Sequence, residues 1–300
     1  MTDIRGTLEA QADAIEDVLR RDESPARVTG GIVTPRWVQF HLTPALGTRA
    51  DRVRALADEI ALALNASQVR VSRQGAAVAV EVRRDDVQPV MLADLMQRLP
   101  ALPMGTAVLG IADDGAPLLL RLPAVDVGHV AIVGAGDVSL ARTMIASLVV
   151  YHRPRNLVLV MRGAFGELAQ LRHVQRIEPR ELIRVTDSRI AGRVSRPLIV
   201  VAFDDVTDAD RHVLIALTRH GHRAGVHIIA CGCDATLTDG ARFGVRLVGA
   251  GEPGYFAAES GAGVTCFTAA CVRGEQWTST LIQRSASKSG EPILSIGRGE

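Results

Sequence analysis

The sequence predicts an α/β protein, in which a three-layer domain around a parallel sheet follows a smaller α+β subdomain. In the second half, short and nearly continuous apolar runs alternate with helical segments, as is typical of strands buried on both faces of a parallel sheet. In the first half, apolar and polar residues alternate with a period of two around an amphipathic helix, which indicates half-buried strands. The 300 residues are enough for two such units.

The first half begins with a predicted helix over residues 4–21, which the breaker sequence Asp-Glu-Ser-Pro ends. A strand or hairpin is predicted after Gly30, and further strands at VRV and VAVEV. Between them, RADRVRALADEIALALN predicts one amphipathic helix with Val53, Leu56, Ile60, Leu62 and Leu64 on its apolar side. A helix at MLADLMQRL and a hairpin at LGIADDGAPLLLRL would close this subdomain.

The second half carries five buried-strand signals, at HVAIV, LVLVM, PLIVVAF, VHIIAC and VRLVG. Helices are predicted at SLARTMIASLVVYH and DADRHVLIALTRHGHRAG, and an antiparallel hairpin at GYFAA and VTCFTAACV. The predicted divisions are therefore 1–27 for the N-terminal helix, 28–122 for the subdomain, 123–284 for the α/β domain and 285–300 for a disordered tail.

Composition limits the choice of partner. The net charge of +1 gives no global attraction to nucleic acid or anionic lipid. No stretch approaches the roughly 20 apolar residues of a membrane helix. The N-terminal residues also lack the apolar core of a secretory signal. We therefore expect a cytoplasmic protein that does not act on membranes.

The four cysteines are Cys231, Cys233, Cys266 and Cys271. Their C-x-C and C-x4-C spacing does not match the usual zinc ligands, and no histidine lies at a finger-like offset. Because they fall in apolar, strand-like runs, we expect buried free thiols and no metal site.

A glycine-rich turn follows the first parallel strand and precedes a helix, the context of a phosphate-binding loop. In the pattern G-x-x-x-x-G-K-[ST], Gly134 takes the first position and Ser139 stands in place of the second glycine. Leu140 and Ala141 replace the lysine and the hydroxyl residue. Asp137 adds a carboxylate where phosphate would lie. On this register, lysine at 140 and threonine at 141, with glycines at 137 and 139, should give measurable nucleotide affinity.

The alternative is a dinucleotide-binding motif G-x-G-x-x-G that begins with Gly134 and Gly136. Ser139 occupies its third position, and the sequence His-Arg-Pro-Arg lies where an acidic ribose partner is needed, so this motif fails too. The chain has one lysine, Lys288 in the predicted tail, so no core lysine can replace the missing one.

The strand PLIVVAFDDV ends in two acidic residues, Asp204 and Asp205. In nucleotide hydrolases, a strand with such an acidic end holds Mg²⁺ and the catalytic acid. Alternatively, Asp205 or Thr207 caps the following helix.

Taken in order, these segments resemble the motor domain of the FtsK/SpoIIIE family of DNA translocases. The resemblance covers about residues 28–284. It runs through GGIVTPRWVQFHLTPALGTRADRVRALADEIALALNASQVRV, LGIADDGAPLLLRLPAVDVGHVAIVGAG, TMIASLVVYHRPRNLVLV, PLIVVAFDD, HRAGVHIIA and GYFAAESGAGVTCFTAACVRGEQ. It implies a RecA-like P-loop NTPase fold, preceded by the family's small alpha subdomain.

The resemblance makes Gly134 the surviving loop glycine and Asp204 the aspartate that ends the magnesium-binding strand. It makes Arg223 the arginine that completes the ATP site of a neighbouring subunit. The family's D-P-K segment has become Arg162-Gly163-Ala164, and its polar sensor falls on Cys233. These departures remove nucleotide chemistry, whereas the strands and core helices are retained.

We therefore expect a non-hydrolysing member with no cofactor, a pseudo-ATPase that binds double-stranded DNA, copies of itself or an active FtsK-type ATPase. The alternative is an active ATP-driven DNA translocase that uses ATP-Mg²⁺ with Asp204, Asp205 and Arg223 as its catalytic residues. A third possibility is a scaffold that contacts neither nucleotide nor DNA, which the near-neutral charge allows.

Two arginine clusters are candidate DNA contacts. One comprises Arg49, Arg52 and Arg54; the other comprises Arg172, Arg176, Arg180 and Arg184, whose spacing of four would place them along one helix. A solvated surface balanced by acidic neighbours is an equally good interpretation.

Overall fold

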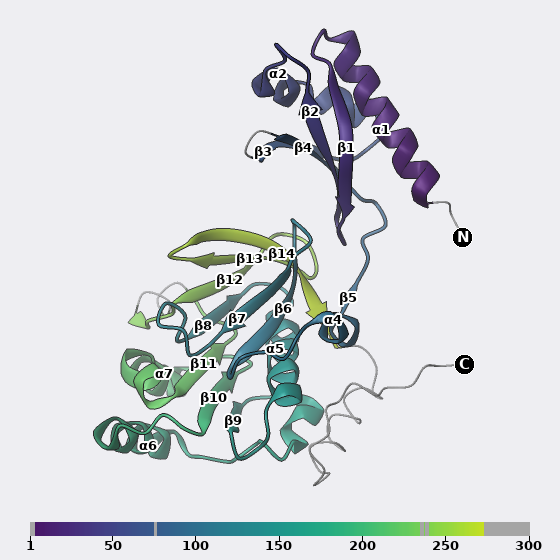
Figure 1. Cartoon of the computed structure of the whole chain (residues 1–300). Coiled ribbons are helices and arrows are strands. Elements are labelled where there is room, and N and C mark those ends of the chain that lie inside the picture. The colour runs from purple at the N-terminus through teal and green to yellow at the C-terminus, as the bar shows by residue number, and fades with distance from the viewer. Residues whose placement is uncertain (1–3, 75–76, 235–236, 238–239, 273–300) are drawn as a thin grey trace, which may run out of the picture. The chain divides into compact units, whose positions relative to one another are not determined.

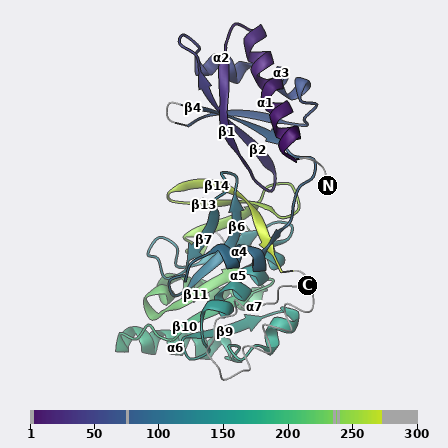
Figure 2. The ribbon, with the colours of Figure 1, turned by 45° about the vertical axis from the view of Figure 1, so that its right-hand side comes forward.

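The computed structural model describes residues 4–74, 77–234, 237 and 240–272. The chain divides into two compact units, Met1–Pro89 with Asp113–Ala116, and the remainder from Val90 onward. Each unit is visible in Figures 1 and 2 and is described separately. No helix among the described residues has the length and apolar character needed to cross a bilayer.

The first unit is a four-stranded antiparallel sheet with strand order β1-β2-β4-β3, covered on one face by helices. Its elements are α1 (Ile4–Arg21), β1 (Ala26–Val33), β2 (Trp37–Pro44), α2 (Ala50–Ala55), α3 (Ala57–Ala63), β3 (Val69–Gln74) and β4 (Ala77–Arg83). The period of two along β2 and β4 puts Phe40 and Val80 in the core, against Ile15 and Leu19 of α1. Figure 2 shows α1 lying along this sheet.

The helix predicted over 49–65 is broken into α2 and α3. The backbone of Leu56 lies outside the helical region, with φ −92° and ψ 13°. The side chains of α3 therefore point in other directions than they would on one continuous helix. Val53 and Ile60 remain buried as predicted, but Leu62 is 83% exposed. The prediction of one continuous apolar side was therefore wrong at Leu62.

The structure also places the division between the units elsewhere than predicted. Helix α1 belongs to the first unit because Ile15 and Leu19 are fully buried in its core, so residues 1–27 are not a separate element. The predicted hairpin does form, but its strands pair with β14 and join the second sheet. The first unit therefore ends near Pro89 rather than at 122. The predicted tail, 285–300, lies outside the described residues.

The second unit is built on a mixed sheet with strand order β7-β6-β14-β13-β12-β8-β11-β10-β9. The strands of the unit, including the short β5 that pairs with β14, are β5 (Val90–Met91), β6 (Thr106–Ala112), β7 (Pro117–Arg121), β8 (Val130–Val133), β9 (Leu157–Arg162), β10 (Leu198–Phe203), β11 (Val226–Ala230), β12 (Val245–Gly249), β13 (Tyr255–Ser260) and β14 (Gly263–Cys271). Strands β12, β8, β11, β10 and β9 are parallel, and β13 and β14 form the predicted antiparallel hairpin.

Helices cover both faces of the parallel strands, which gives the predicted three layers (Figure 1). The helical segments are α4 (Leu92–Arg98), α5 (Asp137–Tyr151), the short 3₁₀ segment η1 (Gly166–Gln170), α6 (Pro179–Gly192), α7 (Asp208–His220) and the 3₁₀ segment η2 (Gly221–Ala224). Helices α4 and α5 pack in one apolar cluster with β8 and β9. Helices α6 and α7 pack in a second cluster on the other face.

Candidate nucleotide-binding site

The loop between β8 and α5 is shorter than a phosphate-binding loop. It consists of Gly134, Ala135 and Gly136, because α5 begins at Asp137. The two glycines have φ angles of +105° and +86°, which residues with a Cβ rarely adopt. In a phosphate-binding loop, six residues run from the first glycine to the second, which directly precedes the lysine. Here only three residues separate the strand from the helix, so less backbone is free to surround a phosphate group.

The structure corrects the register predicted from the sequence. Leu140 and Ala141 are 1% and 0% exposed and belong to the core around α5, so neither position faces the loop. Ser139 lies in the first turn of α5, and its carbonyl accepts a hydrogen bond from the Thr143 hydroxyl (O–O 3.1 Å). Gly134 and Gly136 are therefore in the loop as predicted, whereas Ser139 is not.

Asp137, the first residue of α5, lies near the ends of β8 and β11. Its carboxylate accepts a hydrogen bond from the Val138 N–H (N–O 2.6 Å) and another from the Gly232 N–H, just beyond β11 (N–O 3.1 Å). Backbone N–H groups at the start of a helix are the donors that normally bind phosphate. Here the Val138 donor is occupied by a carboxylate of the chain itself.

Asp204 and Asp205 follow β10 at the same edge of the sheet, because β8, β11 and β10 are neighbouring parallel strands. The Asp204 carboxylate accepts a hydrogen bond from the Ala164 N–H, in the loop after β9. Asp205 is exposed, and its carboxylate lies against Gly232. Thr207, and not Asp205, stands at the N-cap position of α7, although its side chain makes no capping hydrogen bond there. Three carboxylates thus surround the strand ends.

Gly163 is required by the position of Asp204, because it has φ +108° and a Cβ there would overlap the Asp204 carboxylate. We expect Gly163→Ala to lower the free energy of unfolding by about 3 kcal/mol, through backbone strain and overlap together. Urea denaturation would measure it. Gly136→Ala is the matched control, since its φ is +86° but the nearest atom to a Cβ, Cζ of Phe256, is 3.7 Å away. Equal losses from the two changes would contradict the contact with Asp204.

Cys231 and Cys233, beyond β11, are buried free thiols as predicted, whereas Cys266 and Cys271 are half-buried. Burial and then the Asp137 carboxylate raise the pKa of Cys231. Burial followed by Asp234 raises the pKa of Cys233 to about 12, so both stay protonated. Among the described residues, no group of His, Cys, Asp or Glu side chains is arranged to hold a metal ion.

Asp210 is a buried charged residue that the sequence analysis did not single out. Nη2 of Arg162, at the end of β9, pairs with its carboxylate at 3.1 Å, and the Thr207 hydroxyl donates a hydrogen bond to it (O–O 2.6 Å). Arg162 occupies the first position of the family's D-P-K segment. Its charge is therefore directed into the first turn of α7 and not toward the loop.

Arg223 lies on η2, which precedes β11, whereas Asp137 and Asp204 lie at the strand ends on the opposite edge of the parallel sheet. The Arg223 side chain is exposed. Three histidines share its edge of the sheet: His129 before β8, His222 on η2 and His227 on β11. The predicted catalytic residues are therefore separated within one molecule, and Arg223 faces away from the loop of its own chain.

The four arginines proposed as a helical stripe do not lie on one helix. Arg172 and Arg176 precede α6, which begins at Pro179, whereas Arg180 and Arg184 lie within it. All four side chains are exposed. Pro179 at the first position explains where the helix starts, because proline fits there and its predecessor is held extended.

Comparisons with known proteins agree with this architecture. A family model described as the FtsK alpha domain matches residues 2–83. The DNA translocase FtsK of Caldanaerobacter subterraneus subsp. tengcongensis is 25% identical over 158 residues, which cover 50% of this chain and 22% of that protein. FtsK of Streptococcus pyogenes serotype M3 is 24% identical over 275 residues, which cover 72% of this chain and 34% of that protein. The chain thus spans about a third or less of these translocases.

Two solved structures share the fold. The pCW3 conjugation coupling protein TcpA, in its monomer form with ATPgS, superposes with a TM-score of 0.54 at 12% identity, covering 92% of this chain and 99% of TcpA. The cytoplasmic domain of the Thermomonospora curvata type VII secretion ATPase EccC gives a TM-score of 0.54 at 17% identity, covering 68% of this chain and 35% of EccC. The chain is therefore similar to the DNA translocase FtsK: residues 2–83 match the FtsK alpha domain, and the second unit has a RecA-like P-loop ATPase fold.

Proposed function

We propose that this chain is a non-hydrolysing FtsK/SpoIIIE-type subunit, which keeps the subunit fold to bind double-stranded DNA, copies of itself or an active FtsK-type ATPase. The observation that carries the proposal is Asp137. Its carboxylate caps a three-residue loop and accepts the Val138 and Gly232 N–H groups, where a phosphate-binding loop presents free donors.

Electrostatics support the same conclusion. A nucleoside triphosphate would meet Asp137, Asp204 and Asp205 around the strand ends, and the chain's one lysine is residue 288. Phosphoryl transfer depends on positive charge and a metal ion positioned at the phosphates. Removing the lysine, the hydroxyl ligand and the loop backbone together should cost many orders of magnitude in rate.

The exposed Arg223 suits contact with another molecule, because it lies at the edge of the sheet opposite the loop of its own chain. If the family's arginine role persists, Arg223 would serve the ATP of an active FtsK-type subunit. In a ring of identical subunits it would instead be an interface residue with no nucleotide to contact.

We expect the purified chain neither to bind ATP-Mg²⁺ at physiological concentration nor to release phosphate above background. Isothermal titration and a phosphate-release assay would measure both. Asp204→Ala is the control that identifies any residual turnover as belonging to this site. ATP hydrolysis that disappears in Asp204→Ala would overturn the proposal and favour an active translocase.

A further inference from the structure

A cluster of three histidines lies at the edge of the parallel sheet opposite the loop after β8. His129 directly precedes β8, His222 lies on η2 and His227 on β11. The ring centroid of His129 is 6.3 Å from that of His222 and 6.3 Å from that of His227. His129 and His227 are buried, whereas His222 is exposed. Three imidazoles thus meet at one end of β8 and β11.

The two buried imidazoles have ring nitrogens without a hydrogen-bond partner in the described part of the chain. Both nitrogens of His129 and Nε2 of His227 are in this position. Nδ1 of His227 donates to the Gly128 carbonyl (N–O 2.8 Å). A proton added to either ring would therefore be neither solvated nor hydrogen-bonded. Such a buried charge is costly, because its hydration is lost without replacement.

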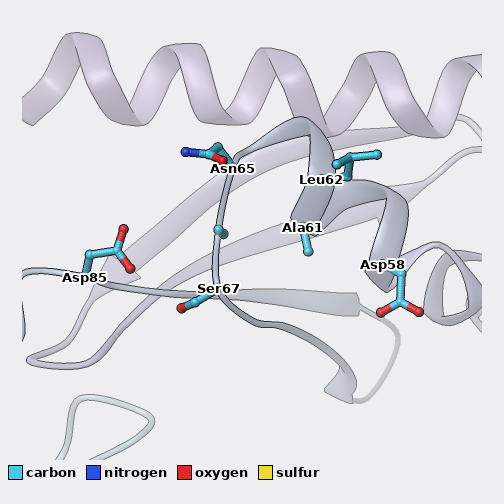
Figure 3. Close-up of a pocket in the computed structure, with 7 residues that line it drawn as sticks. Asp58, Ala61, Leu62, Asn65, Ser67 and Asp85 are labelled. Carbon is cyan, nitrogen blue, oxygen red and sulfur yellow. The ribbon is translucent and has the colours of Figure 1, made fainter.

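Exposed charges on the first unit show the contrast. A shallow groove of about 460 Å³ beside α3 has Asp58 and Asp85 toward its opposite ends (Figure 3). Both side chains are exposed, so water can solvate their carboxylates in place of a partner from the chain. His129 and His227 have no such access to water. They can gain it only if part of the fold opens.

The charges that act on the histidine cluster are all basic. Burial, and then repulsion from His227 and His222, lowers the pKa of His129 to about 3. Burial also lowers the pKa of His227, to about 4. Burial and then the neighbouring Arg223 and His220 lower the pKa of His222. Among the described residues, no carboxylate contributes to any of these three pKa values, so no acid stabilises an imidazolium in the cluster.

The 3₁₀ segment η2 covers His129. A Cβ placed on Gly221, its first residue, would lie 3.3 Å from Cε1 of His129. Segment η2 has four residues, and 3₁₀ hydrogen bonds have poorer geometry than those of an α-helix. It is held by the buried Ala224, whose carbonyl accepts a hydrogen bond from Nη1 of Arg189 on α6 (N–O 3.3 Å). Because β8 and β11 lie inside the sheet, lifting η2 is the least costly way to bring water to His129.

We propose that the histidine cluster is a pH-sensitive switch, which releases η2 and Arg223 from the edge of the sheet when His129 takes up a proton. In the closed form the imidazole stays neutral, whereas in the open form it is solvated and has a pKa of about 6.5. Acid therefore favours the open form, because only that form binds the proton. Protonated His222 adds to the effect, since two imidazolium groups repel each other. The release needs no nucleotide and does not depend on the function proposed above.

Hydrogen exchange of the full chain between pH 7.5 and 5.5 tests the switch, with rates corrected for the intrinsic pH dependence of exchange. The reporters are the amides of residues 221–225, among them the Gly225 N–H, which donates to the His222 carbonyl (N–O 3.2 Å). We expect their protection to fall at least about tenfold, the change that one histidine with an open-state pKa of about 6.5 gives over this range. Urea at about 1 M should not accelerate this exchange at pH 5.5, because a local opening exposes little surface.

His129→Leu and His129→Gln each place a side chain that does not titrate against η2, and each should remove about tenfold of that fall. His220→Leu is the matched control and should keep the fall. It removes an exposed imidazole beside η2 whose charge is not among those that lower the pKa of His129. The amides of β10 report global unfolding of the same unit, and circular dichroism would verify that each variant is folded.

Three results would overturn the proposal. One is a corrected protection of residues 221–225 that is the same at pH 7.5 and 5.5. Another is a protection that is lost only together with that of β10 and that urea lowers equally in both, since exchange would then require global unfolding. The third is a fall that is as steep in both His129 variants as in the wild-type chain.

Discussion

Replacing Leu140 by lysine is expected to unfold the second unit or to destabilise it by about 5 kcal/mol, without creating any affinity for ATP. Leu140 is 1% exposed and packs in the core around α5. Removing a buried leucine costs about 2–5 kcal/mol, and a buried ammonium group without a partner adds to that loss. A loss of this size is comparable with the whole stability of a domain.

The measurement is urea denaturation followed by circular dichroism, with nucleotide titration of whatever remains folded. Ser139→Lys is the matched control: it places the same side chain one residue earlier, at an exposed position of the same helix. It should change stability by no more than about 1 kcal/mol. A Leu140→Lys variant with wild-type stability and new ATP affinity would show that position 140 faces the loop, and would restore the register predicted from the sequence.

The helix after the loop begins earlier than the phosphate-loop pattern implies, at Asp137. Counting from Gly134 assumes that the loop has the length of a phosphate-binding loop. The start of the helix depends instead on which residues its buried side includes. Leu140, Met144 and Leu148 recur every four residues along α5 and are all buried, so Leu140 belongs to the apolar side of the helix. This spacing is present in the sequence and indicates that Leu140 packs in the core.

Other features of the fold followed directly from the sequence. The five apolar runs became the five parallel strands because β-branched residues in short continuous runs suit a sheet buried on both faces. The pairing of β6 with β14 could not be predicted, because Phe267 and Ala112 are partners far apart in sequence. The same holds for the Asp137–Gly232 contact, which joins two loops only after β8 and β11 have become neighbours.

Acidification between pH 7.5 and 5 is expected to lower the free energy of unfolding of the second unit, by about 4 kcal/mol through His129 and His227 and further through the buried His152 and His173. Burial lowers the pKa of His129 to about 3 and that of His227 to about 4. The positive charge of a protonated His222 lowers the pKa of both further, whereas the Gly128 carbonyl partly offsets the effect at His227. In the unfolded chain each imidazole titrates near 6.5. Below that pH the unfolded state binds protons that the folded state does not.

Acid therefore stabilises the unfolded state relative to the folded one. The free energy of unfolding has its full value above pH 6.5. It falls as the pH drops toward the folded pKa values, by about 1.4 kcal/mol per pH unit for each histidine. At pH 5 each therefore contributes a loss of about 2 kcal/mol. The structure gives the physical cause: both ring nitrogens of His129 and Nε2 of His227 are buried without a hydrogen-bond partner among the described residues, so a proton there would be unsolvated.

Urea denaturation at a series of pH values would measure the effect. His129→Leu should reduce the slope between pH 6.5 and 5 by up to about 1.4 kcal/mol per pH unit, because one buried imidazole no longer titrates in the unfolded state. His212→Leu is the control, since it removes an exposed histidine of α7 and should leave the slope unchanged. An equal loss of slope from both substitutions would mean that histidine content, and not the buried pair at the start of β8 and β11, determines the acid sensitivity of this unit.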